Sequence, residues 1–403
     1  MLYKVMISIS GTAPNILQII PRLDGGGAEA TTLEITKALK AAGGRSVVVS
    51  EGGKLSDSII AAGGEIINAP VASKNPFIIY QNINRLARIA EEQNIDIIHA
   101  RSRAPAWSSL WAAQKIGKPY LATYHSKVHD NPKLKILYNS VMTRGVRVIA
   151  NSEFTAARIR VVHKIASEKI AIIPRGCDPA RFDPAHISNA DIKQQRAAWR
   201  VQDGEFVILC PARLTRWKGQ MVLLDAVARL PGNFRLILTG DTSDKTGAES
   251  RFVKELKARA LEAGLSEKLV FAEHVANMPL AYAVADLAVL PSLDPEPFGR
   301  TAVEAQAATL PVIVSDAGGF CETVREDDAL YDSDTNRTGW RVPPGDVDAL
   351  ADKLQTVTSL SDDALSAIGQ AARLWVMENF TTEKMCAQTL QVYQSVIRDY
   401  HSA

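Results

Sequence analysis

Short apolar runs alternate with amphipathic stretches along the chain. In the first half the apolar runs fall at 46–49, 95–100, 120–124, 147–150 and 170–173, and the stretches between them have the composition of helices. Strands buried on both faces of a parallel sheet are almost continuously apolar. Strands that alternate with helices of about 10–15 residues are typical of a doubly wound parallel sheet. The pattern therefore predicts an α/β fold.

The same alternation returns in the second half, with predicted strands at 206–210, 235–238, near Val270, and at 287–290 and 312–314. A chain of 403 residues is expected to form two domains of about 150–200 residues each. The segment from Pro174 to about Gln202 is rich in proline and then polar, which is typical of a linker. We predict domains at 1–180 and 181–381, with closing helices at 361–376 and about 382–400.

A glycine turn follows the first predicted strand. The apolar segment Asn15–Pro21 leads into Gly25, Gly26 and Gly27, and a helix is expected over Ala28–Lys40. Glycine lets the backbone approach a phosphate or a sugar closely at such a helix start. The G-x-G-x-x-G pattern of dinucleotide sites is absent, and a plain tight turn is the alternative.

The most informative stretch is 285–322, which reads as strand, loop, helix, strand and glycine turn. Glu296 lies between Pro295 and Pro297, so it is expected in an extended loop, and Glu304 is expected in the first turns of the helix that begins near Gly299. Open α/β sheets bind ligands at the carboxyl ends of their strands, and a helix start favours a phosphate. We predict that both carboxylates face one crevice. A surface glutamate before an ordinary amphipathic helix is the alternative.

A basic loop follows the strand predicted at 206–210. Arg213, Arg216 and Lys218 lie on this loop, before a helix that is expected from about Met221. A solvated basic loop is one explanation of the three cations.

These motifs together resemble glycosyltransferase family 4, the retaining enzymes of the glycosyl transferases group 1. The segment EPFGRTAVEA resembles the family's Glu-x7-Glu motif, and Arg213 with Lys218 resembles its Arg-x4-Lys element. The segment Ile173–Phe182 resembles the end of the family's first domain, where asparagine is more usual than Arg175. The resemblance implies the GT-B fold, with two Rossmann-like domains facing across a cleft and the last helix, about 382–403, packing back on the first domain.

The resemblance also implies a role for each matching residue. Arg213 and Lys218 would bind the donor diphosphate, together with the helix start at Gly299, Arg300 and Thr301. Glu304 would bind the ribose and Glu296 the donor sugar. Pro297, Phe298 and Gly299 would shape the pocket, and Gly26 and Gly27 would face the diphosphate and the acceptor. His125, which closes the strand predicted at 120–124, would lie near the transferred sugar; a structural histidine is the alternative.

The implied reaction is retaining transfer of a hexosyl unit from a nucleotide-diphosphate sugar, by a front-face route and without a metal or cofactor. Two Asp-x-Asp pairs, at 332–334 and 346–348, invite comparison with metal sites, but we expect loop and N-cap roles for them. His125 and His129 have metal-ligand spacing only if they share a helix, which Pro132 makes unfavourable.

The net charge of +2 conceals an asymmetry between the halves. Residues 1–180 carry 23 Lys and Arg against 13 Asp and Glu, whereas residues 181–403 carry 23 against 31. A basic first domain favours an anionic partner, either acidic lipid or a phosphorylated glycan, and nucleic acid is disfavoured because no binding motif accompanies the charge. The alternative explanation of the positive charge is that the lysines are scattered over the surface and solvated, without binding a partner. The segment Lys133–Arg144 is either a buried core helix or a cationic helix on a membrane surface.

We expect an anionic glycan or lipid-linked acceptor, in the synthesis of lipopolysaccharide or another cell-surface polysaccharide. A soluble acceptor such as a sugar phosphate, an epimerase or phosphorylase of the same fold, and an inactive donor-binding scaffold are the alternatives. Four widely spaced cysteines and no apolar run near 18 residues favour the cytoplasm, with peripheral contact between the basic domain and the inner membrane.

Overall fold

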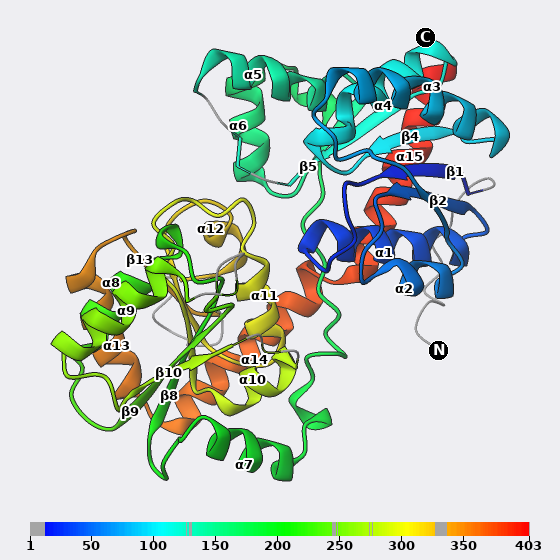
Figure 1. Cartoon of the computed structure of the whole chain (residues 1–403). Helices are drawn as coiled ribbons and strands as arrows, with labels where there is room; N and C mark the ends of the chain where they lie inside the picture. Colours follow the sequence, from blue (N-terminus) through cyan, green and yellow to red (C-terminus); the bar gives the residue numbers. More distant parts are fainter. Residues whose placement is uncertain are drawn as a thin grey trace. The chain divides into compact units, whose positions relative to one another are not determined.

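The computed structural model describes residues 13–125, 127–128, 131–243, 247, 249–273, 275, 277–326 and 337–402. The chain divides into two compact units (Figure 1). Unit 1 comprises Met1–Gly176 and Thr382–Ala403, and unit 2 comprises Cys177–Thr381. Each unit is a parallel sheet with helices on both faces. The prediction of two doubly wound, Rossmann-like α/β domains is confirmed.

Unit 1 contains a seven-stranded sheet in which all pairings are parallel and the strand order is β3-β2-β1-β4-β5-β6-β7. The order reverses between β1 and β4, which creates a switch point where ligands commonly bind. The strands are β1 (Asn15–Ile19), β2 (Arg45–Ser50), β3 (Glu65–Asn68), β4 (Ile97–Ala100), β5 (Tyr120–Tyr124), β6 (Arg147–Ala150) and β7 (Ile170–Ile172). The helices are α1 (Gly27–Ala41), α2 (Ser56–Ala61), α3 (Pro76–Glu92), α4 (Arg103–Lys115), α5 (Lys133–Asn139), α6 (Glu153–His163) and α15 (Thr382–His401), with short 3-10 turns η1 (Ser140–Thr143) and η2 (Ser167–Lys169).

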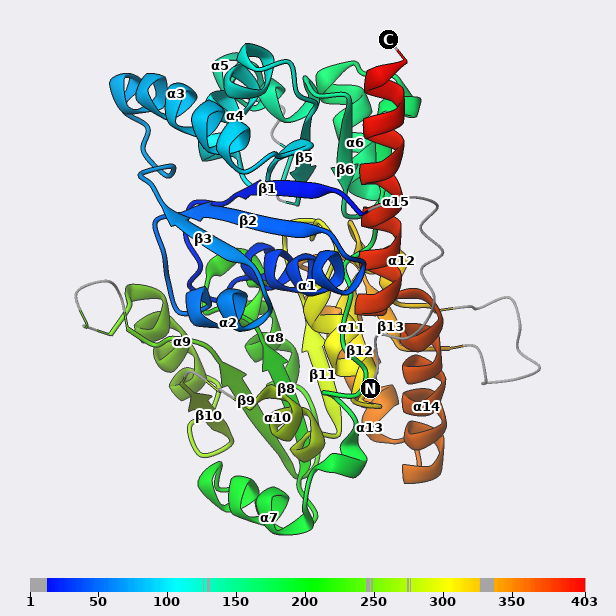
Figure 2. The same ribbon diagram turned by 90° about the vertical axis from the view of Figure 1, so that its right-hand side faces the viewer.

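Helices cover both faces of this sheet because neighbouring strand residues point to opposite sides. Leu17 of β1 packs in a core that α3, α4 and α6 share, whereas the adjacent Ile16 packs in a second core with α1 and α15. The last helix, α15, contacts α1 and lies along this unit (Figure 2). Its Tyr393 hydroxyl contacts Nδ1 of the fully buried His99 at 2.8 Å. The end of the chain therefore completes the core of the first unit.

Unit 2 contains a six-stranded parallel sheet with the order β10-β9-β8-β11-β12-β13. Its switch point lies between β8 and β11. The strands are β8 (Phe206–Pro211), β9 (Phe234–Thr239), β10 (Leu269–Ala272), β11 (Leu287–Leu290), β12 (Val312–Ser315) and β13 (Trp340–Val342). The helices are α7 (Asn189–Ala198), α8 (Gln220–Val227), α9 (Arg251–Glu262), α10 (Met278–Val284), α11 (Arg300–Ala307), α12 (Phe320–Thr323), α13 (Val347–Thr358) and α14 (Asp362–Asn379), with η3 (Pro184–His186) and η4 (Arg216–Lys218).

The segment with linker composition, Pro174 to Gln202, contains a helix and belongs mostly to unit 2. Helix α7 starts at a cap in which the Ser188 hydroxyl accepts the Asp191 N–H at 3.1 Å. None of the residues of α7 is buried. Its sequence is therefore polar and carries no apolar face that would identify a helix. Trp199, directly after it, is buried in the unit 2 core and anchors the segment. The composition of this segment is that of a linker, but the structure has a surface helix there.

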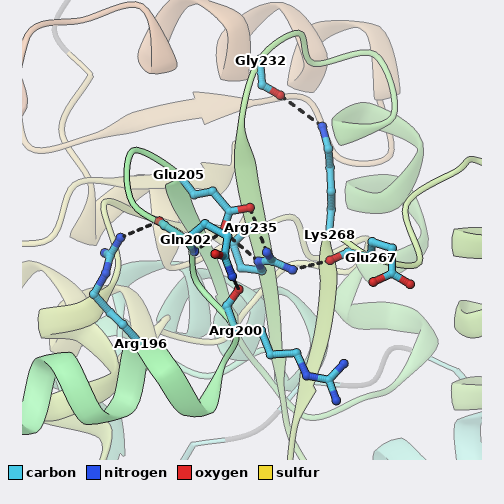
Figure 3. A network of polar contacts seen from close by, with 8 residues as sticks. All are labelled: Arg196, Arg200, Gln202, Glu205, Gly232, Arg235, Glu267 and Lys268. Carbon is cyan, nitrogen blue, oxygen red and sulfur yellow. Dashed lines mark hydrogen bonds and ion pairs between the residues drawn. The ribbon is translucent and has the colours of Figure 1, made fainter.

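A buried ion pair fastens this segment to the amino-terminal edge of the unit 2 sheet (Figure 3). Arg235 of β9 donates through Nε and Nη2 to the two carboxylate oxygens of Glu205, at 3.0 and 2.8 Å. The Gln202 N–H donates to the same carboxylate at 2.8 Å, and Arg196 of α7 donates to the Gln202 carbonyl at 3.3 Å. The network lies at the opposite edge from the carboxyl ends of β8 and β11.

None of the described helices combines the length and the apolar character that a bilayer crossing needs. None of the four cysteines forms a disulfide; Cys321 is exposed, and Cys177, Cys210 and Cys386 are buried.

Candidate functional site

The predicted donor-binding residues of unit 2 meet where β8 and β11 end. These strands are parallel neighbours, with Leu287 of β11 opposite Ile208 of β8. The loops that leave them are joined by a hydrogen bond from the Leu293 N–H to the Trp217 carbonyl, at 2.7 Å. Gly219 has a φ of 75°, and a Cβ there would lie 1.9 Å from the Pro291 carbonyl oxygen. Only glycine fits this approach, which brings the two loops together at the switch point.

Lys218 and Glu296, 78 residues apart in sequence, form an ion pair at the centre of this site. The Lys218 ammonium donates to Glu296 Oε1, and the Ser292 hydroxyl donates to the same oxygen at 3.0 Å. The side chains of Lys218 and Glu296 are only 13% and 10% exposed. Lys218 Nζ also lies 4.4 Å from the centre of the Trp217 ring. The ammonium is thus held in a fixed, largely desolvated position, where it acts more strongly on a nearby charge than it would in water.

Arg213 is the second cation of this loop, and its side chain is exposed. The side-chain amide of the buried Gln220 donates to the Arg213 carbonyl at 2.9 Å, which fixes the backbone at this position. No hydrogen bond or ion pair joins the Arg213 guanidinium to another described residue. Its donors are therefore available to an anionic ligand.

The loop from Glu296 to Gly299 is locked by a second glycine turn. The Gly319 N–H donates to the Glu296 carbonyl at 2.7 Å, and a Cβ on Gly319 would lie 2.4 Å from Phe298 Cα. The Phe298 ring is buried in the core, edge-on to Phe380. Phe298 therefore fixes the loop from below the surface. Gly299 has a φ of 92° and is the N-cap of α11, where it provides no side-chain hydrogen bond.

Glu304 lies one turn along α11 and has its own cation. Arg300 Nε donates to Glu304 Oε1 at 2.8 Å, and both side chains are largely buried. Burial and then the charge of Glu304 raise the pKa of the nearby Tyr282 hydroxyl. The sequence predicted two carboxylates facing one crevice; the structure pairs Glu296 with Lys218 and Glu304 with Arg300.

In unit 1, the glycine turn after β1 begins α1. Gly25 has a φ of 116°, and Gly26 precedes the helix in an extended conformation without a side-chain cap. The buried Arg175 donates to the Gly27 carbonyl at 3.0 Å and to the Thr31 hydroxyl. Gly26 and Gly27 therefore lie in a turn that Arg175 holds in place.

His125 follows β5 at the carboxyl edge of the same sheet and is partly exposed. Burial and the positive charges of Arg175, Arg101 and Arg103 lower its pKa to about 3. Arg101 is buried and donates to Gln18 Oε1 at 2.8 Å through Nε. His125 is therefore a neutral imidazole near neutral pH, within a group of three guanidinium ions.

Comparison with known proteins decides the family. The sequence model described as Glycosyltransferase Family 4 matches residues 25–181, and the one described as Glycosyl transferases group 1 matches residues 191–375. The chain is 32% identical to a glycosyltransferase of solved structure from Rickettsia africae, with a TM-score of 0.86 over 96% of this chain and 100% of that one. The chain belongs to the group 1 glycosyltransferases.

Two curated relatives of this group 1 glycosyltransferase have different substrates in their names. The lipopolysaccharide core biosynthesis mannosyltransferase LpsB of Rhizobium meliloti is 30% identical over 62% of this chain and 66% of its own length. A D-inositol 3-phosphate glycosyltransferase of Jonesia denitrificans is 26% identical over 74% of this chain and 71% of its own length. Membership of the group therefore leaves the acceptor open.

Two residues at the candidate sites of this group 1 glycosyltransferase, Ser292 and Arg101, are not among those that the sequence predicts. Ser292 lies four positions before Glu296 and shares its carboxylate oxygen with Lys218. Arg101 directly follows β4, the strand beside β1 at the unit 1 switch point. Its position after a predicted strand was the available signal, because ligands bind at such strand ends.

The sequence offers two Asp-x-Asp pairs and the pair of His125 and His129 as possible metal sites. Asp346 caps α13 by accepting the Ala349 N–H at 2.9 Å, and Asp348 pairs with Arg229. The pair at 332–334 and His129 lie outside the described residues. Within the described part of the chain, no three His, Cys, Asp or Glu side chains gather as a metal-binding group.

The low pKa of His125 predicts a pH-dependent stability. The folded chain holds His125 neutral down to a pH of about 3, whereas an unfolded histidine binds a proton below about pH 6.5. The contribution of the neutral His125 to the free energy of unfolding is therefore fully present above pH 6.5, and it decreases as the pH falls from 6.5 towards 3. From pH 7 to pH 5 the histidine's contribution should fall by about 2 kcal/mol. Native-state hydrogen exchange of β5 and β6 in wild type and His125→Gln at both pH values measures it: the variant should lose less protection, and equal losses would exclude the effect.

Proposed function

We propose that this chain is a retaining, metal-independent hexosyltransferase that uses a nucleotide-diphosphate sugar as donor. The observation that carries the proposal is the largely buried pair of Lys218 and Glu296 at the switch point, where Lys218 lies on the loop that also carries the exposed Arg213. Such a cluster can stabilise the negative charge that develops on a leaving diphosphate.

Donor binding would use the cations of unit 2 in place of a metal. An ammonium has three donors, and Glu296 accepts one from Lys218, so Lys218 can also bind a phosphate oxygen. Arg213 would provide a bidentate contact. The N–H groups at Gly299, Arg300 and Thr301 would favour the same anion through the helix dipole. These groups would supply the charge stabilisation that a divalent cation gives in other transferases.

The carboxylates would bind hydroxyl groups of the donor. One carboxylate oxygen of Glu304 accepts a hydrogen bond from Arg300 Nε, and the second oxygen would accept from the ribose hydroxyls. Glu296 would accept from hydroxyls of the sugar while it orients Lys218. Pro297 and the buried Phe298 would hold this carboxylate in place through the loop.

Transfer would follow a front-face route. The bond between the sugar C1 and the departing phosphate oxygen breaks, and the acceptor hydroxyl oxygen bonds to C1 from the same face. The hydroxyl proton passes to the departing phosphate oxygen. His125, as a neutral imidazole, would hydrogen-bond the sugar without adding positive charge beside a centre that becomes positive. Gly26 and Gly27 would allow close approach of the diphosphate or the acceptor.

The acceptor we favour is an anionic glycan or lipid-linked glycan, in the synthesis of lipopolysaccharide or another cell-surface polysaccharide. A relative named as a lipopolysaccharide core mannosyltransferase and the basic first half of the chain support this. A soluble sugar phosphate is the second candidate, because relatives are named D-inositol 3-phosphate glycosyltransferases. The cations around His125 suit the phosphate of either acceptor.

Product analysis tests the proposal. The protein is incubated with UDP-, GDP- and ADP-hexoses and with either lipopolysaccharide core oligosaccharides or sugar phosphates, and released nucleotide is quantified. NMR of the product then gives its anomeric configuration. We expect the configuration of the donor to be retained. An inverted product would exclude the front-face route, and nucleotide binding without turnover over the whole panel would favour a scaffold.

A further inference from the structure

A short helix on the surface of unit 1 carries its apolar side chains into solvent. In α5, Leu134, Leu137 and Tyr138 are 79%, 58% and 38% exposed. Their spacing of three and four residues places them on one face of the helix. The following turn behaves differently, since Val141 and Met142 are buried in the unit 1 core. The interpretation of 133–144 as a core helix therefore holds for η1 and is wrong for α5.

The surroundings of α5 are cationic. Residues 101–150 contain nine Lys and Arg and one acidic residue, Asp130. Lys133 and Lys135 of α5 are exposed, and neither pairs with a carboxylate among the described residues. Arg144, at the end of η1, lies 5.1 Å from the centre of the Trp107 ring, and the Trp107 indole donates to the Tyr138 carbonyl at 3.0 Å. Apolar and positively charged groups thus share one region of the surface.

A groove of about 600 Å³ runs between α4, η1 and α6, next to this helix. Among the described residues that line it are the cations Arg144 and Lys169 and the imidazole of His163, whose pKa is lowered by burial, and none of them is a carboxylate. Trp111, which is 41% exposed, forms an apolar wall. His163 Nε2 is buried without a hydrogen-bond partner in the described part of the chain. The groove therefore offers donors for an anion beside a surface for an apolar group. Figures 1 and 2 show α4, α5 and α6 on the same side of unit 1.

We propose that α5 and this groove form a docking surface for an anionic phospholipid bilayer. Leucine and aromatic side chains insert at the boundary between headgroups and acyl chains, and lysines and arginines bind the lipid phosphates. The combination of highly exposed leucines with cations that have no described carboxylate partner matches the two properties of such a surface. The inference extends the proposed function, on which it rests for a lipid-linked acceptor held at the same membrane.

Vesicle co-sedimentation of the full chain tests the surface. Wild type should bind vesicles that contain phosphatidylglycerol and should not bind vesicles of phosphatidylcholine alone. The double variant Leu134→Ser and Leu137→Ser should reduce binding at least tenfold. The matched control is Leu261→Ser on α9 in unit 2, where the leucine is 71% exposed, and it should bind like wild type. Both sets of leucines are exposed, so the fold should tolerate the changes.

Further experiments distinguish binding of a lipid bilayer from binding of a free phosphate or of a second copy of the chain. Glycerol phosphate should not compete for binding, since a free phosphate lacks the apolar contact. Lys133→Ala with Lys135→Ala should weaken binding several-fold, whereas Lys193→Ala on α7 should not. Wild type that fails to bind the anionic vesicles, or equal binding by the double leucine variant, would overturn the proposal. A dimer that the leucine changes dissociate would instead assign α5 to a second copy of the chain. The assay needs no donor, so its failure is distinct from failure of the proposed transfer.

Discussion

Replacing Lys218 by alanine is expected to lower kcat by about two to three orders of magnitude, as loss of a preorganised electrostatic stabiliser commonly does. The Lys218 side chain is only 13% exposed and its ammonium is bonded to Glu296, so it acts in a site from which most water is excluded. The change also leaves the buried Glu296 carboxylate without its cation, which adds a cost to the folded state. Turnover is measured as nucleotide release with the preferred donor and acceptor.

Lys268→Ala is the matched control for this variant. Lys268 also lies over an aromatic ring, 4.2 Å from the centre of Phe234, and donates to the Gly232 carbonyl at 3.1 Å. It belongs to the opposite edge of the same sheet (Figure 3), so its loss should leave kcat unchanged. A Lys218→Ala protein that keeps its circular dichroism spectrum and full turnover would remove Lys218 from the mechanism.

Replacing Arg235 by methionine is expected to destabilise unit 2 by about 3–5 kcal/mol, the usual result of removing one partner of a buried ion pair. The side chains of Arg235 and Glu205 are 8% and 9% exposed, and the variant would leave Glu205 as an unpaired buried charge. Because a chain of two units can unfold in more than one step, native-state hydrogen exchange of β8 and β9 is the suitable measurement.

The double variant Arg235→Met with Glu205→Leu is the control for this prediction. Replacing both members of a buried pair by apolar residues of similar volume is often neutral or stabilising. The double variant should therefore recover most of the protection that the single variant loses. If Arg235→Met alone keeps the exchange rates of wild type, the pair does not stabilise unit 2.

Much of the fold follows from hydrophobic pattern. The strands predicted at 120–124 and 287–290 have the bounds found in the structure, because strands buried on both faces leave an uninterrupted apolar signature. Helix α7 could not be found in this way, since a surface helix without buried residues has the composition of a polar loop. Its cap residue Ser188, three positions before Asp191, was the remaining local signal.

Pairing within the site depends on information that sequence spacing does not contain. Lys218 and Glu296 touch because β8 is the neighbour of β11, and strand order in a sheet is a property of the whole unit. The contact between Arg300 and Glu304 can be predicted from the sequence, since residues four apart on a helix are neighbours. The family resemblance implies a role only for the backbone N–H of Arg300 at the helix start. In the structure the Arg300 side chain also matters, because it holds the Glu304 carboxylate.

Calorimetric titration with UDP, GDP and ADP tests the central claim most directly, using wild type, Lys218→Ala and Glu304→Ala, first without divalent metal and then with magnesium. We predict that one nucleotide binds wild type without metal, and that binding weakens at least tenfold both when the ammonium is removed and when the carboxylate proposed for the ribose is removed. If no nucleotide binds at about 1 mM, or if both variants bind like wild type, the pair of Lys218 and Glu296 does not mark a donor site.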